Sequence, residues 1–270
     1  VELTRLTTKY GENVLDATNA FELVLRDEKQ LAGLPATARD AARESAARKG
    51  LEGWRFTLQA PDYFAVMTYL DDAALRREVY RAHALRGAAE PYDNGALIGR
   101  ILELRREKAL LLGYGDFADL VLEDRMARTG ARALEFLDDL RRKTERHFAR
   151  ENAELLAFRR SLEGPGAPEL EPWDVLYYAE KQRAALYDFD EEALRPYFPL
   201  GSVVDGLFTL VSRLYGIRIT EVSGVPAWDP QVHYYDIHDE DGTFLGGFYA
   251  DWYPRENKRG GAWMDALLTG

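Results

Sequence analysis

Hydrophobic residues recur at helical spacing through most of the chain, and this pattern constrains the fold more than any other feature. Leu97, Ile101 and Leu104 follow one another at intervals of three and four residues, which places them on one face of a helix. A longer stripe, preceded by the candidate N-cap Thr129, contains Leu134, Leu137, Leu140, Phe148, Leu155 and Phe158. We therefore predict a helical region over residues 1–165, ended by the Gly-Pro-Gly-Ala-Pro sequence at 164–168.

Two short segments inside this helical region alternate between apolar and other residues. They are residues 21–26 and 54–59, and both are rich in residue types that favour strands. The stretch between them, 36–49, is rich in Ala and Arg and predicts a helix. The sequence therefore predicts a small two-stranded β ribbon with a helical connection.

The hydrophobic period changes from about 3.6 to 2 after Gly216. Before this point, residues 172–182 predict a helix with Pro172 in its first turn, and residues 200–215 predict another. Beyond it, the strands that we predict cover residues 217–222, 232–238 and 244–253, with the Asp-Glu-Asp-Gly sequence at 239–242 as a hairpin connection. The predicted fold class is therefore mainly α, with a β-rich C-terminal end over about 217–253.

Composition excludes several classes of function. The 270 residues carry a net charge of -11, which disfavours binding to phosphate backbones and anionic membranes, so we expect no nucleic acid and no membrane as partner. The absence of Cys excludes disulfides, thiolate zinc sites, iron–sulfur clusters and Cys nucleophiles. No apolar run approaches the roughly 20 residues that cross a bilayer.

The four His residues are the natural metal or acid–base candidates. No two of them are four residues apart, so the motif His-Glu-x-x-His is absent. His233 and His238 are separated by five positions, which places them on opposite faces of a strand unless a bulge intervenes. We expect these two in the hairpin, His147 packed on the inward stripe of its helix, and His83 packed near a helix end.

The segment at 246–265 concentrates aromatic residues, a basic cluster and a Gly pair. One interpretation is a strand packed on a helix, in which Gly260 and Gly261 allow a tight turn and a close backbone approach. The other is a cleft wall whose cations meet a carboxylate. The cations in question are Arg255, Lys258 and Arg259.

Residues 248–263, Phe-Tyr-Ala-Asp-Trp-Tyr-Pro-Arg-Glu-Asn-Lys-Arg-Gly-Gly-Ala-Trp, resemble a signature of the thimet-oligopeptidase family of zinc metallopeptidases, nearest its oligopeptidase A branch. Other segments resemble the family in the same order, namely 13–18, 61–69, 172–178, 180–182, 194–198 and 232–237. The resemblance thus covers most of the chain. The stretch from Gly87 to Asn94 looks shorter than in that branch, as a trimmed loop would be.

The resemblance implies a helical, channel-forming fold with a small β-sheet near the active centre. Residues 1–165 would form a helical lobe and residues 166–270 the start of the catalytic lobe, truncated before the zinc-binding helix. It implies cytoplasmic hydrolysis of short peptides by one zinc ion, whose ligands and general base lie beyond the signature. No catalytic or metal residue is therefore assigned in this chain. The substrate-channel candidates are Tyr249, Arg255, Lys258, Arg259, Gly260 and Gly261.

Three hypotheses follow from these observations. In the first, the chain is a central fragment of a zinc oligopeptidase, inactive and zinc-free alone, with a separate chain as one source of the catalytic part. This hypothesis also predicts an exposed apolar patch, or self-association, around Phe248, Trp252 and Trp263. In the second, the chain is a non-catalytic module that binds peptides or proteins. In the third, His233 and His238 form an independent metal site.

Overall fold

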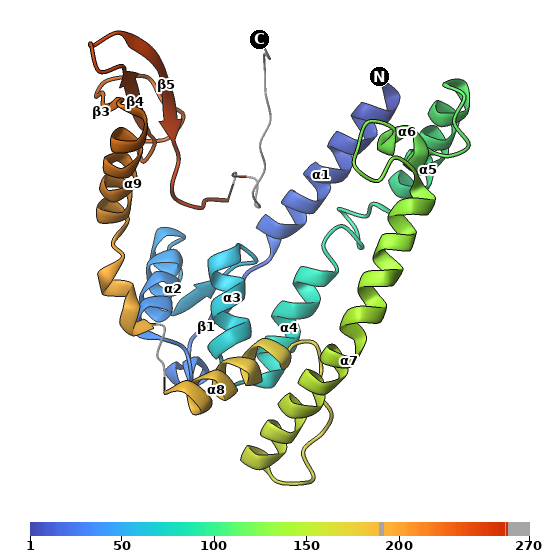
Figure 1. The fold of residues 1–270 in the computed structure, drawn as a ribbon. Coiled ribbons are helices and arrows are strands. Elements are labelled where there is room, and N and C mark those ends of the chain that lie inside the picture. The colour runs from blue at the N-terminus through green and yellow to red at the C-terminus, as the bar shows by residue number, and fades with distance from the viewer. Residues whose placement is uncertain (189–191, 257, 259–270) are drawn as a thin grey trace. The chain divides into compact units, whose positions relative to one another are not determined.

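A computed structural model of the chain describes residues 1–188, 192–256 and 258 (Figure 1). The structure is 59% helix and 9% strand, which confirms the prediction of a mainly helical fold with small antiparallel sheets. The described residues form two compact units within Val1–Tyr187 and Asp188–Lys258. The assignment of residues 1–165 and 166–270 to two lobes of a complete peptidase stays a prediction.

The first unit contains eight α-helices, one 3-10 helix and a two-stranded ribbon among its described residues. In chain order these are α1 (Glu2–Ala20), β1 (Leu23–Leu25), η1 (Glu28–Leu31), α2 (Ala36–Arg48), β2 (Trp54–Phe56), α3 (Ala60–Tyr69), α4 (Ala73–Ala84), α5 (Gly95–Leu111), α6 (Phe117–Leu122), α7 (Gly130–Glu163) and α8 (Val175–Tyr187). None of these helices, nor any other in the described part of the chain, combines the length and apolar character that a membrane crossing requires.

The predicted ribbon forms, but both strands are shorter than the sequence pattern indicated. β1 and β2 pair antiparallel, with Leu23 opposite Phe56. The second strand ends because the side chain of Asp62 in α3 accepts hydrogen bonds from both the backbone N–H and the hydroxyl of Thr57, at 2.8 and 2.7 Å. The backbone N–H of Thr57 therefore bonds to a side chain instead of to the neighbouring strand.

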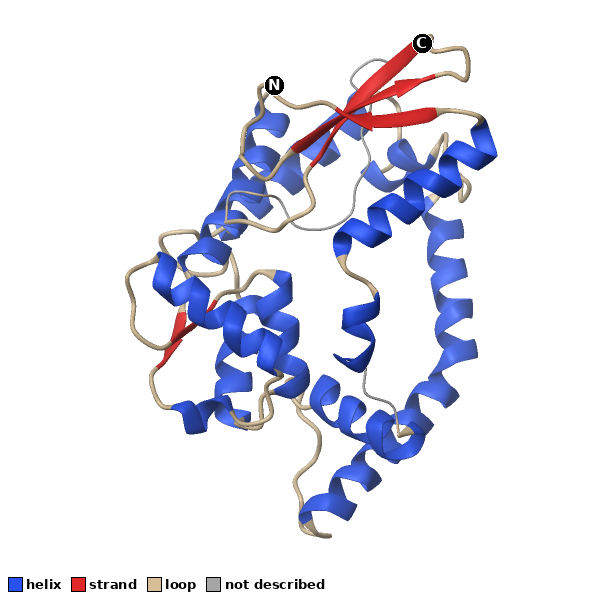
Figure 2. Cartoon of the chain, turned by 90° about the vertical axis from the view of Figure 1, so that its left-hand side faces the viewer, coloured by secondary structure: helices blue, strands red, loops and turns tan. Residues whose placement is uncertain are grey.

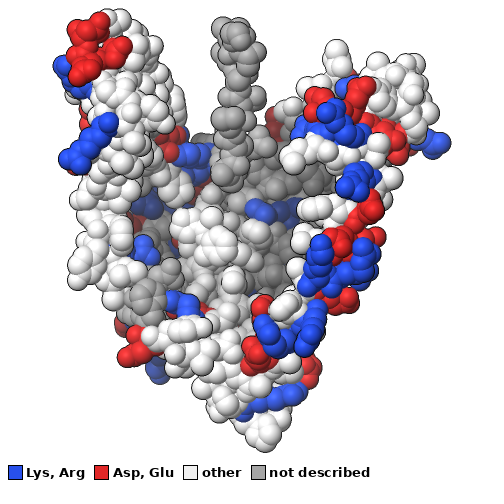
Figure 3. All heavy atoms as spheres, viewed as in Figure 1, with Lys and Arg blue, Asp and Glu red and all other residues white. Residues whose placement is uncertain are grey.

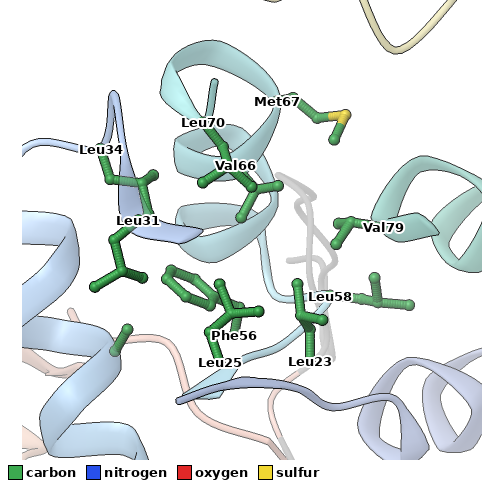
Figure 4. Close-up of a cluster of buried hydrophobic side chains, with 11 residues drawn as sticks. Leu23, Leu25, Leu31, Leu34, Phe56, Leu58, Val66, Met67, Leu70 and Val79 are labelled. Carbon is green, nitrogen blue, oxygen red and sulfur yellow. The ribbon is translucent and has the colours of Figure 1, made fainter. Parts of the chain in front are cut away.

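The hydrophobic core of the first unit lies around this ribbon (Figure 4). Phe56 is almost fully buried and packs with the inward-facing Leu25 of the opposite strand. Val66 of α3 and Leu70, the residue that follows this helix, are both fully buried. Short strands are therefore stabilised here by the helices that cover their apolar residues, since a two-stranded ribbon is marginal alone.

Helix α7 begins as predicted but does not bury its predicted stripe. Thr129 caps the helix by accepting a hydrogen bond from the Arg132 backbone N–H at 3.2 Å, and Gly164 ends it with a φ of 99°. Among the stripe residues, Leu134 is 66% exposed and Phe148 is 69% exposed, whereas Leu155 is buried. The stripe was therefore wrongly assigned to the interior over its first half, because the described partner helix α8 packs near Leu155.

His147 is exposed as well, so its predicted packing on an inward stripe is also wrong within the described chain. His83 is half-buried and stacks on the ring of Tyr63, with ring centroids 4.1 Å apart. Burial, and then the nearby Arg86, lower the pKa of His83. The charges along α7 alternate in sign, as Figure 3 shows, and ion pairs such as Lys143–Asp139 at 2.6 Å mark a solvated face.

A buried carboxylate joins three helices of the first unit. Asp174, which is 2% exposed, accepts a hydrogen bond from Arg76 Nη2 of α4 at 2.8 Å and one from Arg159 Nη1 of α7 at 2.9 Å. The Asp174 carboxylate also accepts from the backbone N–H of Glu171 at 3.2 Å. This turn places the start of α8 at Val175, three residues later than the predicted start at Pro172.

Additional bonds complete the environment of the two arginines. Arg76 donates to the carbonyl oxygens of Leu70 and Asp71, at 2.7 and 3.0 Å. Arg159 donates to Glu163, whose other carboxylate oxygen accepts a hydrogen bond from the Tyr178 hydroxyl. Burial and this bond raise the pKa of Tyr178. Each buried charge is therefore both paired and hydrogen-bonded, which is the condition for a buried ion pair to be tolerated.

The second unit packs one helix on a three-stranded sheet. Its elements are η2 (Glu192–Tyr197), α9 (Leu200–Tyr215), β3 (Arg218–Glu221), β4 (His233–His238) and β5 (Phe244–Ala250). The strand order is β3-β4-β5, all antiparallel, and Figure 2 shows the strands in red. The helix has its predicted bounds, and Gly216 ends it in the left-handed conformation.

The hairpin predicted at 239–242 is confirmed. The backbone N–H of Asp239 donates to the carbonyl of Thr243 at 2.8 Å, and Gly242 has a φ of 89°. The register between β4 and β5 shifts between Ile237 and His238. The hairpin therefore closes next to an irregularity, a frequent feature of strand ends.

We predict that Asp174→Asn strongly destabilises the chain. Removing the carboxylate charge leaves the buried guanidinium of Arg76 without its counter-ion and leaves Arg159 with Glu163 alone. Breaking a buried ion pair in this way typically costs about 3–5 kcal/mol of unfolding free energy. Urea unfolding followed by circular dichroism measures the difference. The matched control is Glu135→Gln, because Glu135 pairs with Arg132 at an exposed position, where the expected loss is below about 1 kcal/mol. Equal losses in the two variants would contradict the prediction.

Candidate functional site

The two faces of the β4–β5 hairpin carry different aromatic groups. Tyr234 and Tyr249 lie opposite each other in the register and share one face, with ring centroids 4.8 Å apart. Trp228 packs against Tyr249 at 5.1 Å on the same side. On the other face, Tyr235 and Phe248 stack at 5.2 Å. This second pair is covered by α9, so the first face is the one available for a functional role.

Helix α9 covers the second face through Phe208. Its ring lies 5.0 Å from that of Tyr235 and 6.2 Å from that of Phe248, both in edge-on geometry. Tyr235 is buried and Phe248 is half-buried as a result. The alternation of side chains along the strands therefore separates a packed face from a face that carries the tyrosine pair.

Gly247 allows the tyrosine face to form. It lies opposite Asp236, and a Cβ at this position would approach the Tyr234 hydroxyl oxygen to 2.0 Å and the Tyr235 carbonyl oxygen to 3.1 Å. The phenol of Tyr234 therefore crosses the strand where a side chain would otherwise stand. A glycine in the middle of a strand is typical of such a close approach.

Immediately after β5, Asp251 collects three donors from the following segment and from a preceding loop. Arg255 binds its carboxylate with both terminal nitrogens, at 2.7 and 2.6 Å. Trp228 Nε1 donates to the same carboxylate at 3.1 Å, and Lys258 Nζ lies 3.2 Å from it. We call these four residues the Asp251 cluster.

The electrostatics of the Asp251 cluster follow from this geometry. The two bonds from Arg255, supported by those from Trp228 and Lys258, hold the pKa of Asp251 well below its usual range. The same bonds raise the pKa of Arg255. Asp229 lies 3.8 Å from Arg255 and adds a second negative charge. The two cations are therefore compensated by carboxylates of the chain itself.

The structure brings three of the six sequence-predicted site residues together. Tyr249 packs against Trp228 in a tilted arrangement, and its hydroxyl donates to the Pro226 carbonyl at 3.1 Å. Arg255 and Lys258 bind Asp251, which also binds Trp228. Arg259, Gly260 and Gly261 lie outside the described residues. Sequence reasoning missed the role of Asp251, although its position four residues before Arg255 is a spacing that permits an ion pair.

The predicted apolar patch lies partly within the described chain. Trp252 is 38% exposed and Tyr253 is also exposed. Phe248 is half-buried against Tyr235, and Trp263 lies outside the described residues. An exposed aromatic pair therefore follows β5, as predicted at Trp252, whereas Phe248 is not exposed as predicted because Phe208 of α9 packs against it.

Comparison with known proteins decides the family. The sequence model described as peptidase family M3 matches residues 66–270 of the chain. The chain belongs to peptidase family M3. The resemblance to the oligopeptidases is thereby confirmed.

Three relatives show how this M3 chain compares with longer proteins. Oligopeptidase A of Haemophilus influenzae is 44% identical over 98% of the chain and 40% of its own length. The organellar oligopeptidase A of Arabidopsis thaliana, named chloroplastic/mitochondrial, is 40% identical over 99% of the chain and 35% of its own length. The dipeptidyl carboxypeptidase of Escherichia coli is 32% identical over 97% and 39%. The M3 chain thus spans about two fifths of these relatives.

Family M3 is zinc-dependent in general. A zinc site requires three or four His, Cys, Asp or Glu ligands. Within residues 1–188, 192–256 and 258, no three such side chains gather closely enough to hold a metal ion. The described residues do not fit zinc, and no chemical step is assigned through it.

His233 and His238 make separate contacts. The Nδ1 atom of His233 lies 2.7 Å from a carboxylate oxygen of Glu221 on the neighbouring strand. The ring of His238 lies edge-on to that of Phe244, at 5.6 Å. The hypothesis of an independent metal site on these two residues lacks a third ligand among the described residues.

We predict that Gly247→Ala destabilises the second unit. The new Cβ must displace the Tyr234 phenol or the strand itself, and overpacking of this kind typically costs about 1–3 kcal/mol. Gly246→Ala is the matched control, because a Cβ there meets nothing within 4 Å. Urea unfolding, monitored by tyrosine and tryptophan fluorescence, compares the two. Equal stabilities would show that Tyr234 moves aside freely.

We predict a pH-dependent contribution of Asp251 to stability. Because the folded-state pKa is depressed below the unfolded value, the contribution is fully present above the unfolded pKa and is lost as the pH falls through the folded pKa. The difference in unfolding free energy between the natural chain and Asp251→Asn should therefore shrink from neutral pH towards strongly acidic pH. Denaturant titrations across that range measure it, and a pH-independent difference would contradict the cause assigned here.

Proposed function

We propose that this M3 chain forms part of a zinc-dependent oligopeptidase that hydrolyses peptide bonds in short peptides. The observation that supports the proposal is the match of the family model to residues 66–270, together with 44% identity to oligopeptidase A over 98% of the chain. The relatives carry names of oligopeptidases and of a dipeptidyl carboxypeptidase. Their shared chemistry is cleavage of peptides, and we extend it to the protein to which this chain contributes.

We further propose that the 270-residue chain alone neither holds zinc nor cleaves peptides. Two observations support this. Its four His residues include no pair four positions apart, and the described residues offer no group of three metal ligands. Zinc, when bound in such an enzyme, activates a water molecule for attack on the scissile carbonyl. The residues of this chain would contact the bound peptide or hold the surrounding segments in position.

In this proposal the Asp251 cluster has a structural role and does not bind the substrate. Arg255 and Lys258 are engaged by Asp251, so they would hold the segment after β5 in place while the substrate lies elsewhere on the sheet. Tyr249 is 43% exposed and would offer its ring to a peptide side chain. We place the working protein in the cytoplasm, with short peptides as substrates and a companion chain as one possible source of the zinc ligands.

A second candidate function is a non-catalytic module that binds peptides or proteins. The observation that favours it is the aromatic face that carries Trp228 and Tyr249, which are 62% and 43% exposed. Aromatic residues dominate the energetics of many recognition surfaces. This function requires no metal ligand from the chain.

Metal analysis and a cleavage assay on the purified 270-residue chain test the first proposal. We expect no stoichiometric zinc and no cleavage of a short quenched-fluorescent peptide, with or without added zinc. Addition of the segment of Haemophilus influenzae oligopeptidase A that lies beyond the matched region should restore zinc-dependent cleavage. Chelator-sensitive cleavage by the chain alone would overturn the predicted inactivity.

Peptide titration by isothermal calorimetry separates the two candidate functions. A binding module should bind a short peptide saturably without any second chain, and Tyr249→Ala should weaken that binding. The expected control is His238→Ala, which changes the hairpin end but not the aromatic face. Absence of saturable binding, combined with restored cleavage in the mixed assay, favours the peptidase framework.

A further inference from the structure

A groove of about 420 Å³ lies between the end of α1, the end of α4 and the loop that follows α4. Its apolar wall is formed by Phe21, Leu85, Pro91 and Tyr92, and two arginines, Arg81 and Arg86, also line it. The volume lies within the range of about 300–1,000 Å³ typical of small-molecule pockets. Apolar walls with a few polar groups are the usual composition of such sites.

Arg86 is a half-buried cation without a carboxylate partner among the described residues. Its Nε donates to the carbonyl oxygen of His83 at 2.9 Å, and its Nη1 donates to the hydroxyl of Thr18 at 3.2 Å. These two bonds fix the guanidinium between α1 and α4. A guanidinium has five N–H donors, so the Nη2 edge has no bonded partner within the described chain.

The surroundings of Arg86 disfavour its charge. Burial lowers the pKa of Arg86, because desolvation penalises the charged form. Arg81 is exposed and likewise forms no ion pair within residues 1–188, 192–256 and 258, and Glu90, which also lines the groove, pairs with neither arginine. Two uncompensated guanidinium groups thus converge on one groove in a chain whose net charge is -11.

The walls of the groove are held in place by a buried amide pair. The side chain of Asn13 in α1 donates to that of Asn94 at 2.9 Å, and the backbone N–H of Asn94 donates to the carbonyl of Gly87 at 2.8 Å. Asn94 is fully buried. Gly87 has a φ of 73°, and a Cβ there would approach Asn94 Nδ2 to 2.6 Å. The loop is therefore tied to α1, and the groove is preformed.

We propose that this groove binds a small organic carboxylate with an apolar body. The carboxylate would accept hydrogen bonds from the Nη2 edge of Arg86 and would be attracted by Arg81, since guanidinium groups match carboxylates in charge and geometry. The apolar body would lie against Phe21, Leu85 and Tyr92. An inorganic anion would leave that wall uncovered, and a neutral ligand would leave Arg86 without a counter-ion.

The site is independent of the peptidase proposal. None of its residues belongs to the Asp251 cluster, and binding there requires neither zinc nor a companion chain. A titration of the 270-residue chain therefore tests it directly, whatever the outcome of the cleavage assays.

The test is an amide NMR titration of the full chain with 3-phenylpropionate. We expect saturable shifts at Phe21, Leu85, Gly87 and Tyr92. Arg86→Gln should weaken binding about tenfold or more, the loss typical of removing a charge-assisted hydrogen bond. Arg77→Gln is the matched control, because Arg77 is an exposed arginine of α4 outside the groove, and it should bind as the natural chain does.

Additional probes define the outcomes that overturn the proposal. The neutral 3-phenylpropionamide should bind about tenfold more weakly or worse, and equal binding would exclude the carboxylate contact. Inorganic phosphate that binds as tightly as 3-phenylpropionate would reduce the site to a simple anion site and overturn the assigned class. If Arg86→Gln loses the native amide spectrum, Arg81→Gln decides, with an expected weakening of about threefold. Unchanged binding in that variant, or shifts confined to other elements, would also overturn it.

Discussion

The helical unit depends on one buried carboxylate that faces two buried arginines. Asp174 is 2% exposed and connects α4 and α7 to the start of α8 through Arg76 and Arg159. Buried charges of this kind stabilise a fold only when every partner is in place. The main apolar core lies around the short ribbon, and α7 meets α8 in a smaller apolar cluster at Leu155 and Tyr178. The ion pairs add a fixed geometry between these two helices and α4.

The second unit also contains a carboxylate that binds two cationic side chains, but this carboxylate is more exposed to solvent. The Asp251 carboxylate binds Arg255 and Lys258, but its side chain is 15% exposed, so water screens part of the interaction. The cluster therefore orders the segment after β5 and leaves the tyrosine face of the hairpin open. In both units one carboxylate binds two cationic side chains and fixes their positions. The more deeply the carboxylate is buried, the more the stability of the unit depends on its ion pairs.

The family and the geometry point to complementary roles for the parts of this M3 chain. Membership in peptidase family M3 is shown by the match over residues 66–270, whereas the described residues offer aromatic and ionic framework rather than metal ligands. The groove beside Arg86 contains neither the residues of the Asp251 cluster nor those of the aromatic face. The guanidinium of Arg86 has no carboxylate partner among the described residues, and the peptidase proposal does not explain this.

The sequence by itself determined most of the secondary structure. Periodicity located α9 and the hairpin strands, and Thr129 marked the start of α7, because caps and periodicity are local properties of the chain. It also carried the family signature. Only the tertiary structure decided which groups are buried together. Asp174 meets partners 98 and 15 residues away, and the stripe on α7 stays exposed at Leu134, because burial depends on elements that distant parts of the sequence supply.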